Sequence, residues 1–202
     1  MTSASRYNAV PRGALVKRNV AETRPAVYND YRGGAERHDG RVCICKMNEE
    51  LPDEAAILAL NDAHRSETSA LEANRLHALL AQAFHVGLRR RGHDAFLIAL
   101  DQDAISSSPN FQWFRSRYKR FVYVDRVIVA PDKRGRGLAR GLYEELFAAA
   151  AHAGHGIVGC EVNVEPPNPA SDAFHEALGF SEVGRALILG GEKLVRYLTR
   201  DV

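Results

Sequence analysis

Hydrophobic positions follow helical and strand periods from Leu51 to the end of the chain, whereas residues 1–46 show no sustained period. Apolar residues spaced three and four apart predict helices, and short runs of β-branched residues bounded by glycine or proline predict strands. The predicted helices span 54–64, 66–83, 137–153 and 169–178, and the predicted strands span 85–90, 95–100, 121–129, 157–164, 181–188 and 193–199, with a short aromatic segment over 111–118. This order predicts an α/β (α+β) fold, a mixed sheet with helices on its faces.

Length and composition predict one globular domain with an extension. The chain has 202 residues, of which 46% are hydrophobic and 26% charged. We assign 47–202 to the domain and expect 1–46 to be a basic and mostly disordered extension, because it is interrupted by proline and glycine. That extension holds nine Lys/Arg and four Asp/Glu, against 18 and 21 in the remainder. Such an arm could contact nucleic acid, but a loose tail without a partner is the simpler interpretation.

Further compositional features exclude whole classes of protein. No run of 18 uncharged apolar residues is present, so no membrane partner is expected. Three cysteines do not make a disulfide framework, which predicts a reducing, cytoplasmic location. Cys43 and Cys45 form a lone C-x-C without a second cysteine pair, and no metal is expected there.

A basic, glycine-rich turn joins a predicted strand to the longest predicted helix. It reads Arg134-Gly135-Arg136-Gly137-Leu138-Ala139-Arg140. Backbone N–H groups at a helix start lack intrahelical partners, and the helix dipole there favours negative charge. Gly135 and Gly137 have no Cβ, so an anion can approach the backbone closely. The turn therefore predicts a pyrophosphate site, with a solvated glycine-rich turn as the alternative.

Two common phosphate-binding motifs do not fit this turn. No Lys-Ser/Thr pair follows the glycines, which excludes a P-loop. Arg140 stands where the dinucleotide-binding fingerprint needs a small residue. Arg134, Gly137 and Ala139 instead fit Gln/Arg-x-x-Gly-x-Gly/Ala, and this stretch resembles motif A of the GNAT superfamily of acyl-CoA N-acyltransferases.

A second stretch carries the same resemblance. Glu161-Val162-Asn163 lies on a predicted strand, and a predicted helix that follows Asn168 ends in Leu-Gly-Phe at 178–180. This is similar to the family's next strand and helix, and the resemblance covers about residues 51–202. It implies a GNAT-like fold with splayed central strands, with acetyl-CoA as the acyl donor and no metal.

The resemblance also implies a set of binding residues. The backbone of one central strand would bond the pantetheine arm as an added strand does, the turn would hold the pyrophosphate, and an asparagine would contact the pantetheine or the acyl portion. The residues at these positions are Val127, Ile128 and Val129 on the strand, Arg134, Gly135, Arg136, Gly137, Leu138, Ala139 and Arg140 in the turn, and Asn168.

The implied reaction is direct attack of a primary amine on the acetyl thioester in a ternary complex. It needs a base, a stabilised oxyanion and a protonated leaving thiolate. Glu161 is the first candidate for the base. Asp125 and Tyr123, which period-two alternation places on one face, are the alternates, although Asp125 could instead form a structural pair with Arg126 or with a loop arginine.

The proton donor is the point at which the sequence departs from the family. His175 stands where the family usually has a tyrosine, so the donor is His175, water, or neither. The main-chain N–H near Val129 would polarise the thioester carbonyl. Cys160 is expected to be a small buried strand residue.

The acceptor is expected to be an amine of a small molecule or a protein. Candidate acceptor-side residues are Ser66, Glu67, Thr68, Ser69, Ser107, Asn110, Phe111, Trp113 and Phe114. Of these, Trp113 and Phe114 could border a small substrate or could instead form a packed aromatic cluster. A non-catalytic acyl-CoA-binding sensor is the alternative function. A homodimer through the C-terminal strands is a further possibility that the sequence leaves open.

Overall fold

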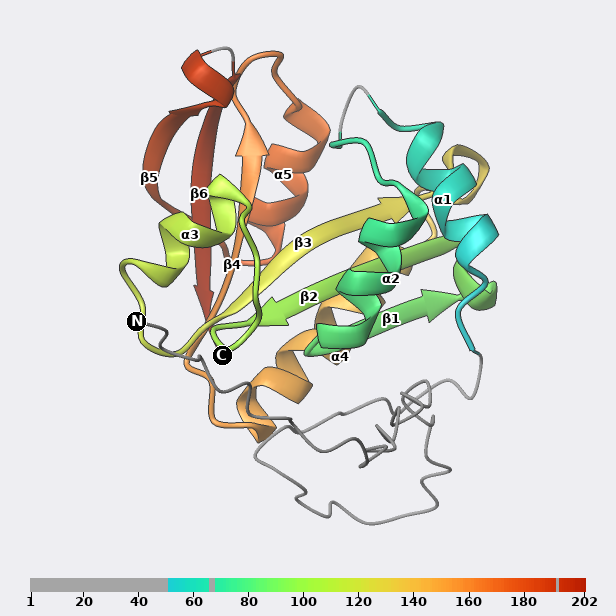
Figure 1. Ribbon diagram of the computed structural model, residues 1–202, viewed down its shortest axis with the longest axis horizontal. Helices are drawn as coiled ribbons and strands as arrows, with labels where there is room; N and C mark the ends of the chain where they lie inside the picture. Colours follow the sequence, from blue (N-terminus) through green and yellow to red (C-terminus); the bar gives the residue numbers. More distant parts are fainter. Residues whose placement is uncertain (1–50, 66–67, 192) are drawn as a thin grey trace, which may run out of the picture. The chain divides into compact units, whose positions relative to one another are not determined.

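A six-stranded mixed sheet runs through residues 51–65, 68–191 and 193–202, the part of the chain that the computed structural model describes. The strands lie in the order β1-β2-β3-β4-β6-β5 (Figure 1), with β3 and β4 parallel and the other neighbours antiparallel. Their bounds are β1 His85–Arg89, β2 Ala95–Asp101, β3 Val122–Val129, β4 Ile157–Asn163, β5 Ser181–Ile188 and β6 Lys193–Asp201. The predicted fold class is confirmed, and each predicted strand is present.

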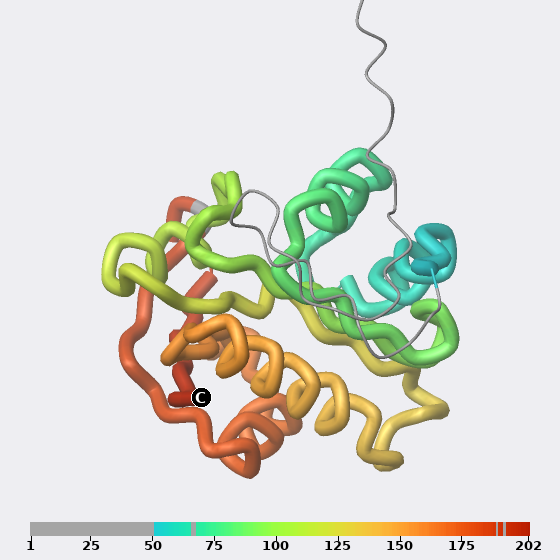
Figure 2. Tube along the Cα trace, turned by 90° about the horizontal axis from the view of Figure 1, so that it is seen from below, coloured from blue at the N-terminus to red at the C-terminus, as the bar shows by residue number. Residues whose placement is uncertain are grey.

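Helices cover both faces of the sheet (Figures 1 and 2). The helices are α1 Glu54–Asp62, α2 Ala73–Gln82, α3 Pro109–Arg115, α4 Leu138–His152 and α5 Pro169–Ala177. α1, α2 and α3 pack on one face, and α4 and α5 pack on the other. The extension over 1–46, with Cys43 and Cys45, lies outside the described residues. No helix among the described residues is long and apolar enough to cross a bilayer.

Side-chain caps explain where several helices begin. The carboxylate of Asp53 accepts a hydrogen bond from the Ala56 N–H at the start of α1, and the hydroxyl of Ser108 caps α3 in the same way. Asn168 caps α5, with its Oδ1 atom accepting from the Ser171 N–H at 3.1 Å. Such caps satisfy donors that a helix leaves unpaired in its first turn.

The helix predicted over 66–83 is shorter than expected. α2 begins at Ala73, and Glu72 before it has an extended backbone. The preceding segment bonds back to the end of α1 instead: the Thr68 N–H and hydroxyl both donate to the His64 carbonyl four residues earlier, and the Ser69 carbonyl accepts from Asn61 Nδ2. A threonine hydroxyl that bonds a nearby carbonyl offers the backbone an alternative to a continued helix, and the prediction was wrong over 68–72.

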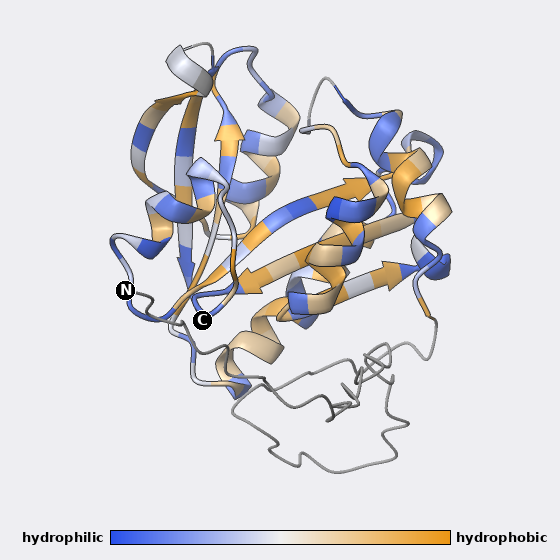
Figure 3. Ribbon diagram, viewed as in Figure 1, coloured by the Kyte–Doolittle hydropathy of each residue, from blue (hydrophilic) through white to orange (hydrophobic). Residues whose placement is uncertain are grey.

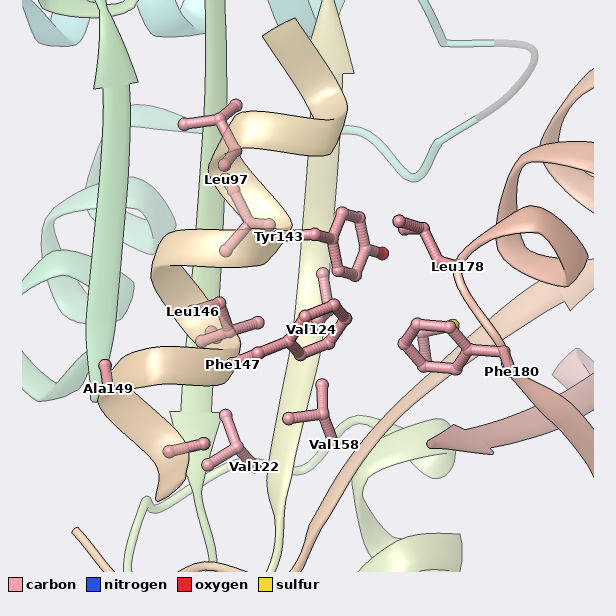
Figure 4. Packing of buried hydrophobic residues seen from close by; sticks show 14 of the residues in the cluster. Leu97, Val122, Val124, Tyr143, Leu146, Phe147, Ala149, Val158, Leu178 and Phe180 are labelled. Atoms are coloured by element: carbon pink, nitrogen blue, oxygen red, sulfur yellow. The ribbon is translucent and has the colours of Figure 1, made fainter. Parts of the chain in front are cut away.

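Two hydrophobic clusters flank the sheet. The central strands β2 and β3 are largely hydrophobic (Figure 3), and β2 is buried on both faces up to Leu100. In the cluster on the α4 face, Tyr143 and Phe147 pack against β3 and β4, and Tyr143 projects toward Leu178 (Figure 4). Cys160 is buried in the same cluster, as predicted.

On the opposite face of the sheet, aromatic side chains of α3 pack directly against two glycines. A Cβ on Gly159 of β4 would lie 2.4 Å from the Phe114 ring, and a Cβ on Gly184 of β5 would lie 2.6 Å from the Trp113 ring. Phe111 and Phe114 are fully buried. These two candidate acceptor residues therefore belong to the packed aromatic cluster, and they fix α3 against the strands.

The strands β3 and β4 pair only briefly. Their register holds two residue pairs, Val122 with Val158 and Tyr123 with Gly159, and the strands then diverge (Figure 1). β3 also carries a bulge at Asp125, which has no partner in the register with β2. Strict alternation does not continue through a bulge, so the predicted shared face of Tyr123 and Asp125 does not follow from spacing. The divergence leaves a gap in the sheet.

Candidate active site

The glycine-rich turn forms the N-terminal end of α4, beside the gap. Gly135 and Gly137 have φ values of +73° and +77°, a left-handed conformation that favours glycine, and a Cβ on either would meet no atom within 4 Å. The first hydrogen bond of α4 runs from the Gly141 N–H to the Gly137 carbonyl at 3.0 Å. The amides of Leu138, Ala139 and the next residue, Arg140, therefore precede the helical ladder.

Positive charge surrounds these amides. Arg134, Arg136 and Arg140 are all exposed on the turn, and Arg134 donates from Nε to the Val129 carbonyl at 3.4 Å. Three guanidinium groups, left-handed glycines and the amides of a helix start fit a doubly charged phosphate group. The predicted pyrophosphate residues therefore lie together, with the chemistry that such a group needs.

A cavity of about 280 Å³ lies next to this turn. Its walls come from the end of β3, the turn before α4 and its first residues, one side of α5 and the segment before α2. The lining residues are Thr68, Val127, Ile128, Val129, Arg134, Ala139, Asn168, Ala170, Ser171, Phe174 and His175. All three strand residues that the sequence assigned to the pantetheine arm line this cavity, and so does Asn168.

Glu161 lies on β4 just beyond the last residue pair that joins β3 to β4. Its Oε2 atom accepts a hydrogen bond from the Tyr123 hydroxyl at 2.8 Å, and its Oε1 atom accepts one from Asn110 Nδ2 at 2.7 Å. Asn110 Oδ1 in turn accepts from the Tyr197 hydroxyl at 3.1 Å. β3 and α3 thus each donate to the carboxylate, and β6 is connected to it through Asn110.

The surroundings set the ionisation of this carboxylate. Burial raises the pKa of Glu161 to about 7, the hydrogen bond from Tyr123 lowers it, and the charge of Asp125 raises it. Burial also raises the pKa of Tyr123 well above its usual value, so this phenol stays protonated and remains a donor. A partly exposed carboxyl group with a pKa near neutrality has the properties of a general base.

Asp125 has a different environment. Its Oδ2 atom lies 2.8 Å from Arg126 Nε, and both side chains are almost fully buried. Arg126 also donates to Asn61 Oδ1 at 2.6 Å and to the Ser69 hydroxyl at 3.5 Å. Asp125 is therefore held in an ion pair that ties β3 to α1 and to the segment before α2.

His175 lies in the wall of the cavity and is 4% exposed. Its Nδ1 atom lies 2.7 Å from the Ser171 carbonyl oxygen, so Nδ1 carries the proton and donates it there. Its Nε2 atom lies 2.9 Å from the Tyr143 hydroxyl, which is then the donor. Burial lowers the pKa of His175, so the side chain is neutral at pH 7. An imidazolium donor, as the sequence suggested, does not fit this environment.

Sequence reasoning missed part of this arrangement. Tyr143 and Tyr197 were not singled out, and Asn110 was considered only for the acceptor side. No local pattern could have indicated them, because Asn110 lies 51 residues from Glu161 and 87 from Tyr197 along the chain. Ser66 and Glu67 lie outside the described residues.

Fold and site together define an α/β protein whose mixed sheet opens between β3 and β4, beside a basic turn that fits a phosphate group. A sequence profile of the Acetyltransferase (GNAT) family matches residues 60–180. The chain therefore belongs to the acetyltransferase (GNAT) family.

Solved structures with the same fold have low sequence identity to this chain. Chaetomium thermophilum Naa20 in complex with a bisubstrate analogue is 18% identical, covers 75% of this chain and 83% of its own, and has a TM-score of 0.57. The ribosomal-protein-alanine N-acetyltransferase from Brucella melitensis is 22% identical over 74% and 94%, with a TM-score of 0.55. The yncA structure from Salmonella typhimurium with its cofactor acetyl-CoA is 18% identical over 75% and 91%, with a TM-score of 0.51.

One curated relative matches over a short stretch. The L-2,4-diaminobutyric acid acetyltransferase of Nocardia farcinica is 39% identical over 57 residues. That stretch is 28% of this chain and 28% of the relative, so the chain matches little more than a quarter of the relative's length.

Proposed function

We propose that this protein is an acetyl-CoA-dependent N-acetyltransferase that acetylates a primary amine of a small molecule or a protein. The observation that carries the proposal is the position of Glu161. A carboxylate with a pKa of about 7 lies on β4 where β3 and β4 separate. Glu161 does not itself line the cavity, whose walls include Val127–Val129 of β3 and the first turn of α4.

The residues of the gap fit the acyl donor. The amides of 138–140 and the three arginines of the turn would hold its pyrophosphate, and the backbone of Val127–Val129 would bond its pantetheine arm. Asn168 is placed at the other wall of the cavity, with its Oδ1 atom engaged in the cap of α5. When bound, acetyl-CoA would supply a thioester whose acyl carbon is open to attack by an amine.

Glu161 would take the proton from the attacking amine. A free amine is mostly protonated at neutral pH, so a base near the acceptor raises the fraction of reactive amine. Tyr123 and Asn110 hold both carboxylate oxygens in place, and each oxygen keeps a lone pair for the proton. Asp125, the alternate base, is engaged by Arg126. The main-chain N–H near Val129 would polarise the thioester carbonyl.

The geometry favours water as the proton donor to the leaving thiolate. The single N–H of neutral His175 is already bonded to the Ser171 carbonyl. His175→Gln is therefore expected to lower turnover less than tenfold, whereas a loss of a hundredfold or more would identify His175 as the donor.

The experiment that tests the function combines binding with turnover. Acetyl-CoA at 100 times its Kd should stabilise the protein by about 2.7 kcal/mol, and ATP or NAD at equal concentration should stabilise it less. CoA release is then measured with a panel of amines that includes L-2,4-diaminobutyrate and a peptide with an N-terminal alanine. No stabilisation by acetyl-CoA would overturn the proposal, and binding without CoA release for any amine would indicate a sensor.

A further inference from the structure

We propose that Asn110 is a positioning residue for Glu161, and that the hydroxyl of Tyr197 fixes the orientation of its side-chain amide. The catalytic meaning of this inference rests on the proposed function, in which Glu161 is the base. The effect of Asn110 on the ionisation of Glu161 is a property of the free protein and is tested without turnover.

The amide orientation follows from its two partners. Asn110 is 9% exposed, and its Nδ2 atom lies 2.7 Å from Glu161 Oε1 while its Oδ1 atom lies 3.1 Å from the Tyr197 hydroxyl. Burial raises the pKa of Tyr197 to about 12, so this hydroxyl is protonated and donates to Oδ1. A flipped amide would set Oδ1 against the carboxylate, and two acceptors would then face each other.

Aromatic packing holds Asn110 and Tyr197 in place. Trp113, on the same helix as Asn110, stacks on the Tyr197 ring with centroids 4.0 Å apart and planes 16° apart. Trp113 itself rests against Gly184, and Phe114 rests against Gly159. The donor is therefore on a helix that is fixed to β4 and β5, which is the rigidity that a positioned hydrogen bond needs.

The consequence of the contact is a preference for the ionised carboxylate. An ionised Oε1 accepts a stronger hydrogen bond from Nδ2 than the oxygen of a neutral carboxyl group does. Tyr123 makes the equivalent contact to Oε2, so Asn110 is one of two donors to this carboxylate. The other titratable groups that face Glu161 or act on it electrostatically are Asp125 on β3, Tyr197 on β6, Cys160 on β4 and Tyr143 on α4. Of these, Asp125 raises the pKa of Glu161.

The decisive variant is Asn110→Leu, which keeps the side-chain size and removes the donor. The pKa of Glu161 is measured in the free protein from its protonated-carboxyl infrared band, which is assigned by its loss in Glu161→Gln. Loss of a hydrogen bond to a charged group should raise this pKa by about one unit. With a competent amine, the acidic limb of kcat/KM should move to higher pH by the same amount, so the rate on that limb falls about tenfold.

Two further variants separate positioning from general disturbance. Gln112 lies on the same helix, is exposed and donates to the Ser106 carbonyl, so Gln112→Leu should leave the pKa of Glu161 unchanged. Tyr197→Phe keeps the ring beneath Trp113 and removes the orienting hydroxyl. It should raise the pKa by less than Asn110→Leu does, and it should add nothing in the Asn110→Leu background.

The inference is overturned if a folded Asn110→Leu protein keeps the wild-type pKa of Glu161, or if the effect of Tyr197→Phe persists in full without Asn110. If Asn110→Leu does not fold, Tyr197→Phe decides, since an unchanged pKa there also overturns it. A shifted infrared pKa in a protein that acetylates no amine would leave Asn110 as the positioning residue and remove the proposed function.

Discussion

The Nε2 atom of His175 lies 2.9 Å from the hydroxyl of Tyr143, in a buried contact that joins α5 to α4. On the other side of the ring, Nδ1 donates to the Ser171 carbonyl. Both nitrogens are thereby satisfied by a neutral imidazole, and a second proton on Nε2 would require the Tyr143 hydroxyl to accept instead of donating. His175, which stands at the family's tyrosine position, therefore lines the cavity with both ring nitrogens engaged by protein groups.

This contact predicts a loss of stability in acid. The pKa of His175 in the folded protein is lowered below its ordinary value of 6.5, chiefly by burial. At His175 the unfolded chain therefore binds more protons than the folded protein below pH 6.5, so the contribution of this residue to the free energy of unfolding should fall as the pH drops through that range. Glu161 acts in the opposite direction, because its pKa is raised to about 7 in the folded protein, so the two groups are separated by comparing wild type with His175→Gln. In denaturant unfolding at pH 7.5 and 5.0, the wild type should lose stability relative to the variant at the lower pH, and an equal stability difference at both pH values would contradict the assignment.

Gly137→Asp should abolish stabilisation by acetyl-CoA. The substitution places a carboxylate among the amides that precede the ladder of α4, where it would repel a phosphate. It also forces an aspartate into a left-handed backbone with φ near +77°. Gly190→Asp is the matched control, because Gly190 has φ +68°, open space around it and a place in the β5–β6 turn, away from the cavity. Thermal unfolding with and without acetyl-CoA should show the ligand shift lost only in Gly137→Asp.

Glu161→Gln should spare acetyl-CoA binding and lower turnover by about 10²-fold or more. The base must be ionised to act, so kcat/KM of the wild type should fall as the pH drops below about 7, the pKa of Glu161. That limb should disappear in the variant. A pH–rate profile with the best amine of the panel tests both points, and equal turnover of the two proteins would show that Glu161 is not the base.

Gly159→Ala should destabilise the fold. The added Cβ would lie 2.4 Å from the fully buried Phe114 ring, which cannot move aside freely, and overpacking of this kind costs about 1–3 kcal/mol. Gly156→Ala is the control, because a Cβ there meets nothing within 4 Å and should change stability by less than about 0.5 kcal/mol. Chemical denaturation of both variants gives the comparison. Equal stability of the two would mean that α3 does not press on β4 as described.

The sequence predicted what depends on local pattern and missed what depends on tertiary contact. The turn from Arg134 to Arg140 could be interpreted because strand, glycines and helix are adjacent along the chain. Tyr143 and Tyr197 could not be assigned in this way, because each meets its polar partner across 32 or 87 residues and looks like an ordinary core aromatic. The bulge at Asp125 could not be predicted either, because the register of β3 is set by its pairing with β2 and not by its own sequence pattern.

Only two residue pairs join β3 to β4, so the sheet consists of two three-stranded parts, β1-β2-β3 and β4-β6-β5, which are joined by this short pairing. Buried side chains contact both strands beside this short pairing: Phe114 meets Tyr123 of β3 and Gly159 of β4 on one face, and Tyr143 packs among residues of both strands on the other. Substitution of these buried residues should therefore change the spacing of β3 and β4, and with it the affinity for a ligand held between them, without touching the ligand.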